Sequence, residues 1–130
     1  MRYPFGQYET ENITSRTGKK LTEITLDAVK EGNIVADDIK ISKEVLHAQG
    51  EVSLEAGNEP MKRNFDRAAE MVDIPDEILL EMYNKLRPNR ATKLELVTMA
   101  QTLLDKYNAK NCARLVMEAV EIYEKRGILL

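Results

Sequence analysis

The chain contains 130 residues, a length that predicts one domain. Charged residues make up 32% and hydrophobic residues 43% of the chain, a balance that fits a folded globular protein. The formal net charge of −3 argues against a nucleic-acid-binding protein, because recognition of phosphate requires a basic surface.

Residues 1–40 are predicted to form an extended N-terminal arm that lies against a partner protein. The arm mixes turn-forming residues with isolated apolar ones, and Thr17-Gly18-Lys19-Lys20 predicts a turn. Asp37-Asp38 predicts a second turn or a short helix near the end of the arm. The composition is too apolar for a solvated tail, so we expect the arm to bind a partner.

One short helix is predicted within the arm, from Leu26 to Glu31. Thr25 precedes it and can cap its N-terminus. Gly32 follows it and can end the helix in a left-handed conformation.

Residues 41–130 are predicted to form a single helical domain. Apolar residues recur there at helical spacing, and four breaks containing Gly57, Pro75, Pro88 and Asn108 divide the pattern. The predicted helices cover about residues 42–56, 58–72, 76–86, 92–107 and 109–126. The fold class is therefore all-α, with about five helices whose short links favour antiparallel neighbours.

Local signals support the ends of these helices. Ser42 is a suitable N-cap for the first helix, and Thr92 with Glu95 forms a capping box for the fourth. Gly127 ends the last helix. Gly50 lies inside the first helix, where glycine costs up to about 1 kcal/mol relative to alanine.

No catalytic, cofactor-binding or metal-binding residue is predicted on this chain. Glu44 and His47, at E-x-x-H spacing, could bind one metal, but the carboxylate-bridged di-iron bundles need two such pairs. We interpret His47 as a surface or interface residue, with a small metalloenzyme as an alternative. Cys112 has no neighbouring histidine or cysteine, so we interpret it as a small buried side chain.

The compartment is predicted from what the chain contains. A single cysteine excludes an internal disulfide and favours a reducing cytosol. No apolar run approaches the roughly 20 residues of a membrane helix, and residues 1–7 do not resemble a secretory signal. We expect a cytoplasmic protein that does not enter a membrane.

Several stretches resemble the small subunit of the adenosylcobalamin-dependent diol and glycerol dehydratases. The most specific are residues 63–70, Arg-Asn-Phe-Asp-Arg-Ala-Ala-Glu, and residues 74–88, which begin Ile-Pro-Asp-Glu and end Leu-Arg-Pro. Further similar stretches are residues 3–4, 17–26, 38–42, 92–96 and 118–123. The sequence departs from the family pattern at Gly50, at residues 57–60 and at Lys85.

The resemblance implies a complex of three kinds of subunit that pairs into a dimer of heterotrimers. A large TIM-barrel subunit would hold the substrate, and the large and medium subunits together would hold adenosylcobalamin. The reaction implied is the radical dehydration of propane-1,2-diol or glycerol to an aldehyde. The small subunit would lie against the large one and contribute no catalytic residue.

Four residues are predicted at the interface with the partner: Phe5, Tyr83, Arg87 and Pro88. Aromatic and arginine side chains beside the end of a helix make good anchors. Alternatively, Tyr83, Arg87 and Pro88 close a helix within the core of this chain.

The resemblance also bears on location and leaves one alternative function. Some relatives carry an additional N-terminal stretch that directs them into a bacterial microcompartment, and the similar region here begins at Tyr3. We therefore expect that stretch to be absent, with the enzyme either free in the cytoplasm or directed to a microcompartment through another subunit. The alternative function is a free-standing helical adaptor that binds a partner protein.

Overall fold

The computed structural model describes residues 1–130, and the regular elements of the chain are all helices. The chain divides into two compact units, Met1–Ala69 and Glu70–Leu130. The all-α prediction is confirmed. The predicted boundary near residue 40 falls inside the first unit, and binding of the arm to a partner stays a prediction.

The arm contains four short helical elements: α1 (Phe5–Tyr8), the 3-10 helix η1 (Leu21–Glu23), α2 (Leu26–Lys30) and α3 (Ala36–Ile39). The predicted helix is confirmed as α2. The Thr25 hydroxyl accepts a hydrogen bond from the amide of Ala28 at 3.1 Å, and Gly32 has a φ of +78°. The turn and the short helix predicted at residues 17–20 and 37–38 are also present.

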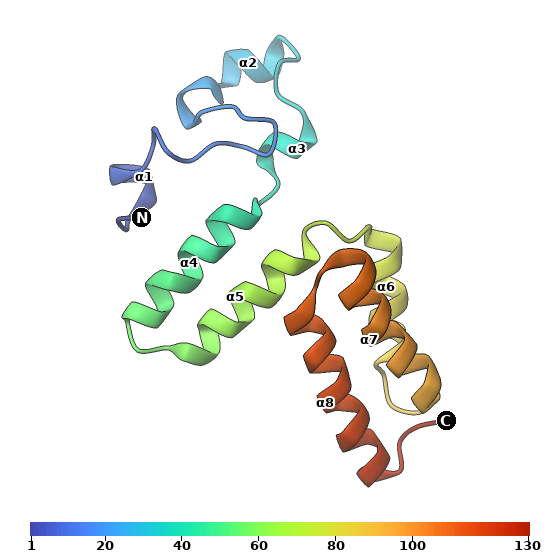
Figure 1. Cartoon of the computed structure of the whole chain (residues 1–130). Helices are drawn as coiled ribbons and strands as arrows, with labels where there is room; N and C mark the ends of the chain where they lie inside the picture. Colours follow the sequence, from blue (N-terminus) through green and yellow to red (C-terminus); the bar gives the residue numbers. More distant parts are fainter. The chain divides into compact units, whose positions relative to one another are not determined.

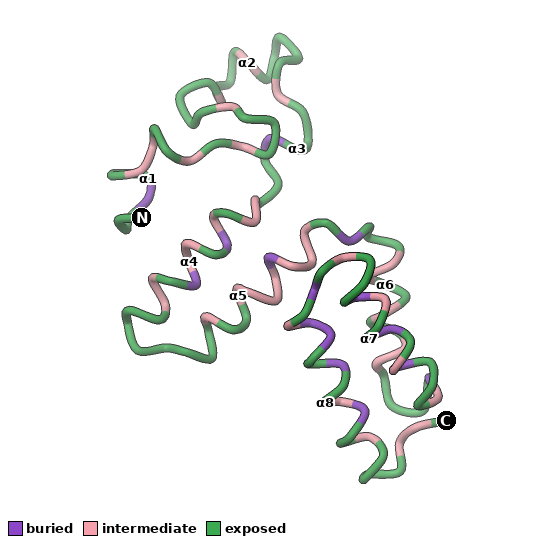
Figure 2. Tube along the Cα trace, in the orientation of Figure 1, coloured by how far each residue is buried: buried purple, intermediate pink, exposed green.

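Two elements of the arm, α1 and η1, were not predicted. Each is a single turn or less, so it is too short to display the apolar periodicity from which helices are inferred. Between Phe5 and Leu46, only Asp38 is buried, so most of the arm is drawn as exposed or intermediate in Figure 2.

Helices α4 (Lys43–Glu55) and α5 (Glu59–Met71) form a helical hairpin (Figure 1). The hydroxyl of Ser42 accepts a hydrogen bond from the amide of Val45 at 3.4 Å, so Ser42 is the N-cap of α4 as predicted. Gly50 is buried, and a Cβ atom built on it would lie 3.3 Å from the Cβ of Phe65. The glycine that weakens α4 therefore permits a close approach of α5.

The second unit contains α6 (Asp76–Lys85), α7 (Lys93–Tyr107) and α8 (Lys110–Arg126). Its core is a continuous apolar cluster in which Leu96 has no exposed surface, and α7 packs along α8. The buried residues of these two helices are visible as recurring segments in Figure 2. The predicted capping box is confirmed, with the amide of Glu95 3.2 Å from the Thr92 hydroxyl.

The N-terminus of α8 is capped from a distance. Ala109 precedes the helix and has no side-chain acceptor. Instead, the carboxylate of Glu70 accepts hydrogen bonds from the backbone amides of Asn111 and Cys112, at 2.9 and 2.8 Å. A carboxylate at this end of a helix satisfies free amides and interacts favourably with the helix dipole. None of the helices has the length and apolar character needed to cross a membrane.

Candidate partner interface

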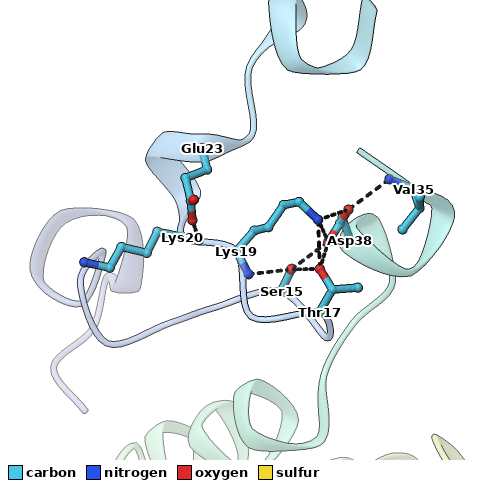
Figure 3. Close-up of polar contacts among 7 residues, drawn as sticks. All are labelled: Ser15, Thr17, Lys19, Lys20, Glu23, Val35 and Asp38. Carbon is cyan, nitrogen blue, oxygen red and sulfur yellow. Dashed lines mark hydrogen bonds and ion pairs between the residues drawn. The ribbon is translucent and has the colours of Figure 1, made fainter. Parts of the chain in front are cut away.

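Asp38 is the structural centre of the arm (Figure 3). Its Oδ1 atom accepts hydrogen bonds from the hydroxyls of Thr17 and Ser15, the latter at 2.8 Å. Its Oδ2 atom accepts the amide of Val35 at 2.9 Å and lies 3.1 Å from the ammonium nitrogen of Lys19. We call Ser15, Thr17, Lys19, Val35 and Asp38 the Asp38 cluster.

The backbone places these groups around one carboxylate. Gly18, with a φ of +92°, allows the tight turn in which the amide of Ser15 bonds to the carbonyl of Lys19 at 2.8 Å. The pKa of the Asp38 carboxyl lies well below its ordinary value of 3.8. The hydrogen bond from the hydroxyl of Thr17 is the main cause, followed by the hydrogen bond from the amide of Val35. Asp38 is therefore a carboxylate at neutral pH, which suits its acceptance of several donors.

Five large aliphatic side chains of the arm are exposed and three more, Ile13, Ile24 and Ile34, are half-buried, while this carboxylate is buried. Leu26 retains 70% and Ile39 77% of its full exposure. We call the following set the exposed aliphatic arm residues: Leu21, Leu26, Val29, Val35 and Ile39. Single exposed apolar residues are ordinary, but a concentration of them in one segment is typical of an interaction surface.

Phe5, which was predicted at the interface, is buried in α1. Its ring contacts that of Tyr3 edge to face, with 5.6 Å between the ring centroids. Tyr3 and Tyr8 are exposed, and the Arg2 guanidinium lies 3.8 Å from the centroid of the Tyr8 ring. The tyrosines beside Phe5 are thus more accessible than Phe5 itself, whose role at an interface stays a prediction.

Tyr83, Arg87 and Pro88 are all exposed, Tyr83 to 56%. The carbonyl of Leu86 accepts a hydrogen bond from the hydroxyl of Tyr123 at 2.5 Å. Tyr123, and not Tyr83, therefore fixes the end of α6, and we call Tyr83, Arg87 and Pro88 the corner at this end. Exposure disfavours the alternative in which the three residues close a helix within the core. Their contact with a partner stays a prediction.

The sequence did not reveal a groove of about 400 Å³ between α6 and α7. Its apolar lining includes Ile78, Met82 and Leu94, and Leu94 is 75% exposed. Lys85, at the edge of the groove, lies 3.4 Å from Glu81 and 4.0 Å from Glu95. The lining of the groove comes from two separate helices that must first pack together, so no local sequence pattern could predict it.

His47 belongs to a polar network that joins α4 and α5. Its Nδ1 atom lies 3.1 Å from Asp66, whose other oxygen lies 2.7 Å from Lys62. Burial raises the pKa of Asp66, but the hydrogen bonds from Lys62 and His47 outweigh it and leave that pKa lowered.

The residues considered for metal chemistry are placed as follows. Glu44 is exposed, and no group of three or more histidine, cysteine, aspartate or glutamate residues is positioned to hold a metal ion. Cys112 is buried at the start of α8, which confirms the interpretation of it as a small buried side chain.

Residues 1–130 match a family model described as dehydratase small subunit. The chain is also similar to the propanediol dehydratase small subunits of Citrobacter freundii and Salmonella typhimurium, each with 40% identity over 124 residues. These alignments cover 95% of this chain and 72% of each relative. The similarity therefore includes the arm as well as the helices of the second unit.

Proposed function

This chain belongs to the dehydratase small-subunit family, and we propose that it is the non-catalytic small subunit of a propanediol or glycerol dehydratase complex. The observation that carries the proposal is the 40% identity to propanediol dehydratase small subunits over 95% of the chain. The reaction of the complex would convert propane-1,2-diol to propanal and water, a lyase reaction.

The cofactor proposed for the complex is adenosylcobalamin, which when bound supplies the radical that begins dehydration. The residues of this chain do not form a site that fits it. The only imidazole, that of His47, is exposed and hydrogen bonded to Asp66, and the groove between α6 and α7 is open to solvent. We therefore assign the cofactor to the large and medium subunits, as the resemblance implies.

The proposed partners are the large and medium subunits, in a dimer of heterotrimers. We assign the contact with the large subunit to the arm and to the corner formed by Tyr83, Arg87 and Pro88. The concentration of exposed aliphatic residues in the arm supports this assignment, because burial of apolar surface drives stable association. The proposed location is the cytoplasm, free or inside a bacterial microcompartment.

Co-expression tests the proposal. This chain would carry an affinity tag and be produced with the large and medium dehydratase subunits of the same organism. We expect all three to co-purify and to form an aldehyde from propane-1,2-diol or glycerol only when adenosylcobalamin is added. The control is the same preparation with a tag on the medium subunit and this chain omitted.

Purification of this chain as a monomer without the co-expressed large and medium subunits, and with no associated activity, would contradict the proposal. That result would favour the alternative of a free-standing helical adaptor. Stoichiometric metal in the isolated chain would instead support the metalloenzyme alternative.

A further inference from the structure

We propose that the Asp38 cluster holds the arm in its docking shape before the partner binds, so that the exposed aliphatic arm residues reach the large subunit on a preformed scaffold. This inference rests on the proposed function, because the binding partner it names is the large dehydratase subunit.

The Asp38 cluster joins residues that are far apart in the sequence. Asp38 is 23 residues from Ser15, 21 from Thr17 and 19 from Lys19, and it also bonds to the nearby amide of Val35. One side chain therefore closes the loop that carries η1 and α2. Because closing such a loop is opposed by chain entropy, it needs a strong contact at its base, and charge-assisted hydrogen bonds provide one.

The loop that the Asp38 cluster closes contains no fully buried apolar side chain. Asp38 is the only buried residue between Phe5 and Leu46, and Figure 2 shows almost all of the arm as exposed or intermediate. One more polar contact joins the same segments, from the side chain of Arg16 to the carbonyl of Ile41 at 2.9 Å. The arm is thus held by polar contacts at its base, which leaves its aliphatic side chains available to a partner.

The exposed groups of the arm indicate the chemistry of the partner surface. Residues 21–40, which hold the exposed aliphatic arm residues, also carry more exposed acidic than basic groups, whereas Arg16 and Lys20 lie just before this segment. The acidic groups are Glu23, Asp27, Glu31 and Asp37, and the basic groups are Lys30 and Lys40. Electrostatic complementarity then favours a large-subunit surface that is apolar at its centre and basic around it.

Preorganisation has a measurable consequence. A segment that is already ordered does not lose its conformational entropy when it binds, so its affinity is higher than that of a flexible segment with the same side chains. Loosening the Asp38 cluster should therefore weaken assembly even though Asp38 itself is buried within this chain and does not contact the partner.

The test is a competition in which wild-type and variant small subunits, carrying different tags, are co-expressed with the large and medium subunits. Asp38→Asn removes the negative charge and replaces one carboxylate oxygen with an NH2 group. Either the Val35 amide and the Lys19 ammonium, or the hydroxyls of Ser15 and Thr17, then lose their acceptor. We expect about tenfold less Asp38→Asn than wild type in the purified complex, consistent with loss of charge-assisted hydrogen bonds. Glu55→Gln is the matched control, since Glu55 is an exposed acidic residue outside residues 21–40, and we expect it to be incorporated as well as wild type.

A second, milder variant keeps the test valid if Asp38→Asn does not fold. Thr17→Val removes one hydroxyl donor from an exposed position and should reduce incorporation less than Asp38→Asn, in the same direction. In the isolated full chain, hydrogen exchange at the amides of Ser15, Lys19 and Val35 should accelerate in both variants. Exchange at the amides of Asn111 and Cys112, bonded to Glu70, should be unchanged.

Two results would overturn the inference: incorporation of Asp38→Asn at the wild-type level, or exchange of the Ser15 and Val35 amides in the free wild-type chain at the rate of an unstructured peptide. Either could occur while the wild-type complex assembles and remains active, in which case the proposed function would stand. Failure of the wild-type chain to assemble at all would instead remove the proposed function, and with it this inference.

Discussion

The two regions that bury side chains most differently are the arm and the second unit. In Glu70–Leu130 the buried side chains are apolar and surround Leu96, whereas in the arm the buried group between Phe5 and Leu46 is the carboxylate of Asp38. The second unit has the arrangement of an ordinary domain, whose stability comes from burying apolar surface. In the arm, by contrast, polar contacts surround a buried carboxylate and five large aliphatic side chains are exposed.

This difference separates two roles. A unit with an apolar core holds itself together, and changes to its core should alter the free energy of unfolding. A segment built around a carboxylate contributes little apolar burial of its own, so changes to its exposed residues should alter association with a partner. The following experiments probe that separation.

The largest expected effect is that of Leu96→Ala. Leu96 has no exposed surface, and removing a buried leucine side chain lowers the free energy of unfolding by about 3 kcal/mol. The matched control is Leu94→Ala on the same helix, where the side chain is 75% exposed and the change should be within about 0.5 kcal/mol. Urea denaturation followed by circular dichroism measures both, and equal effects would contradict the account of the core.

The second expected effect is on assembly. The double variant Leu26→Ser and Ile39→Ser should weaken association with the large subunit by about 2 kcal/mol or more, because both side chains would lose apolar contacts. Its free energy of unfolding should be almost unchanged. Leu94→Ser is the control, since Leu94 is equally exposed but lies in the second unit. Equal retention of both variants by a tagged large subunit would argue against the arm as the interface.

A smaller effect is expected at Glu70. Glu70→Gln replaces one of the two oxygens that accept the amides of Asn111 and Cys112, and should lower the free energy of unfolding by about 1 kcal/mol. Glu118→Gln, an exposed change on α8, serves as the control. Thermal unfolding with no difference between the two variants would show that the distant cap contributes nothing.

The smallest expected effect is on pH dependence. The pKa of Asp38 is lower in the folded arm than its ordinary value of 3.8, so its contribution to stability is complete above that value and is lost as the pH falls below it. Protection of the Ser15 and Val35 amides, corrected for intrinsic exchange rates, should therefore decrease in acid. In Asp38→Asn this decrease should be absent, and its persistence would assign the acid sensitivity to another carboxyl group.

Most of the fold could be predicted because its longer helices carry repeated local signals. The apolar stripe and the capping box of Thr92 and Glu95 lie within a few residues of each other, and so they locate α7 from the sequence alone. The cap of α8 was missed because its acceptor, Glu70, lies 41 residues before Asn111. Contacts of that range depend on tertiary packing, which propensity does not describe.

The Asp38 cluster was missed for a related reason. Asp37-Asp38 indicates only the start of a helix, and nothing nearby shows which carboxylate turns inward. The spacing of Ser15, Thr17 and Lys19 by two residues is a weak signal that three donors share one side of the segment. The interface residues follow from the resemblance and from exposure, because the groups that would define them belong to another chain.

The most direct test of the central claim is side-chain footprinting of this chain, alone and in the complex with the large and medium subunits. Hydroxyl radicals should modify Leu26 and Ile39 in the free chain and modify them much less in the complex, while Leu94 is modified to the same extent in both. That result would establish the arm as the surface that joins the small subunit to its partner. Unchanged modification of Leu26 and Ile39 in an assembled, active complex would contradict it.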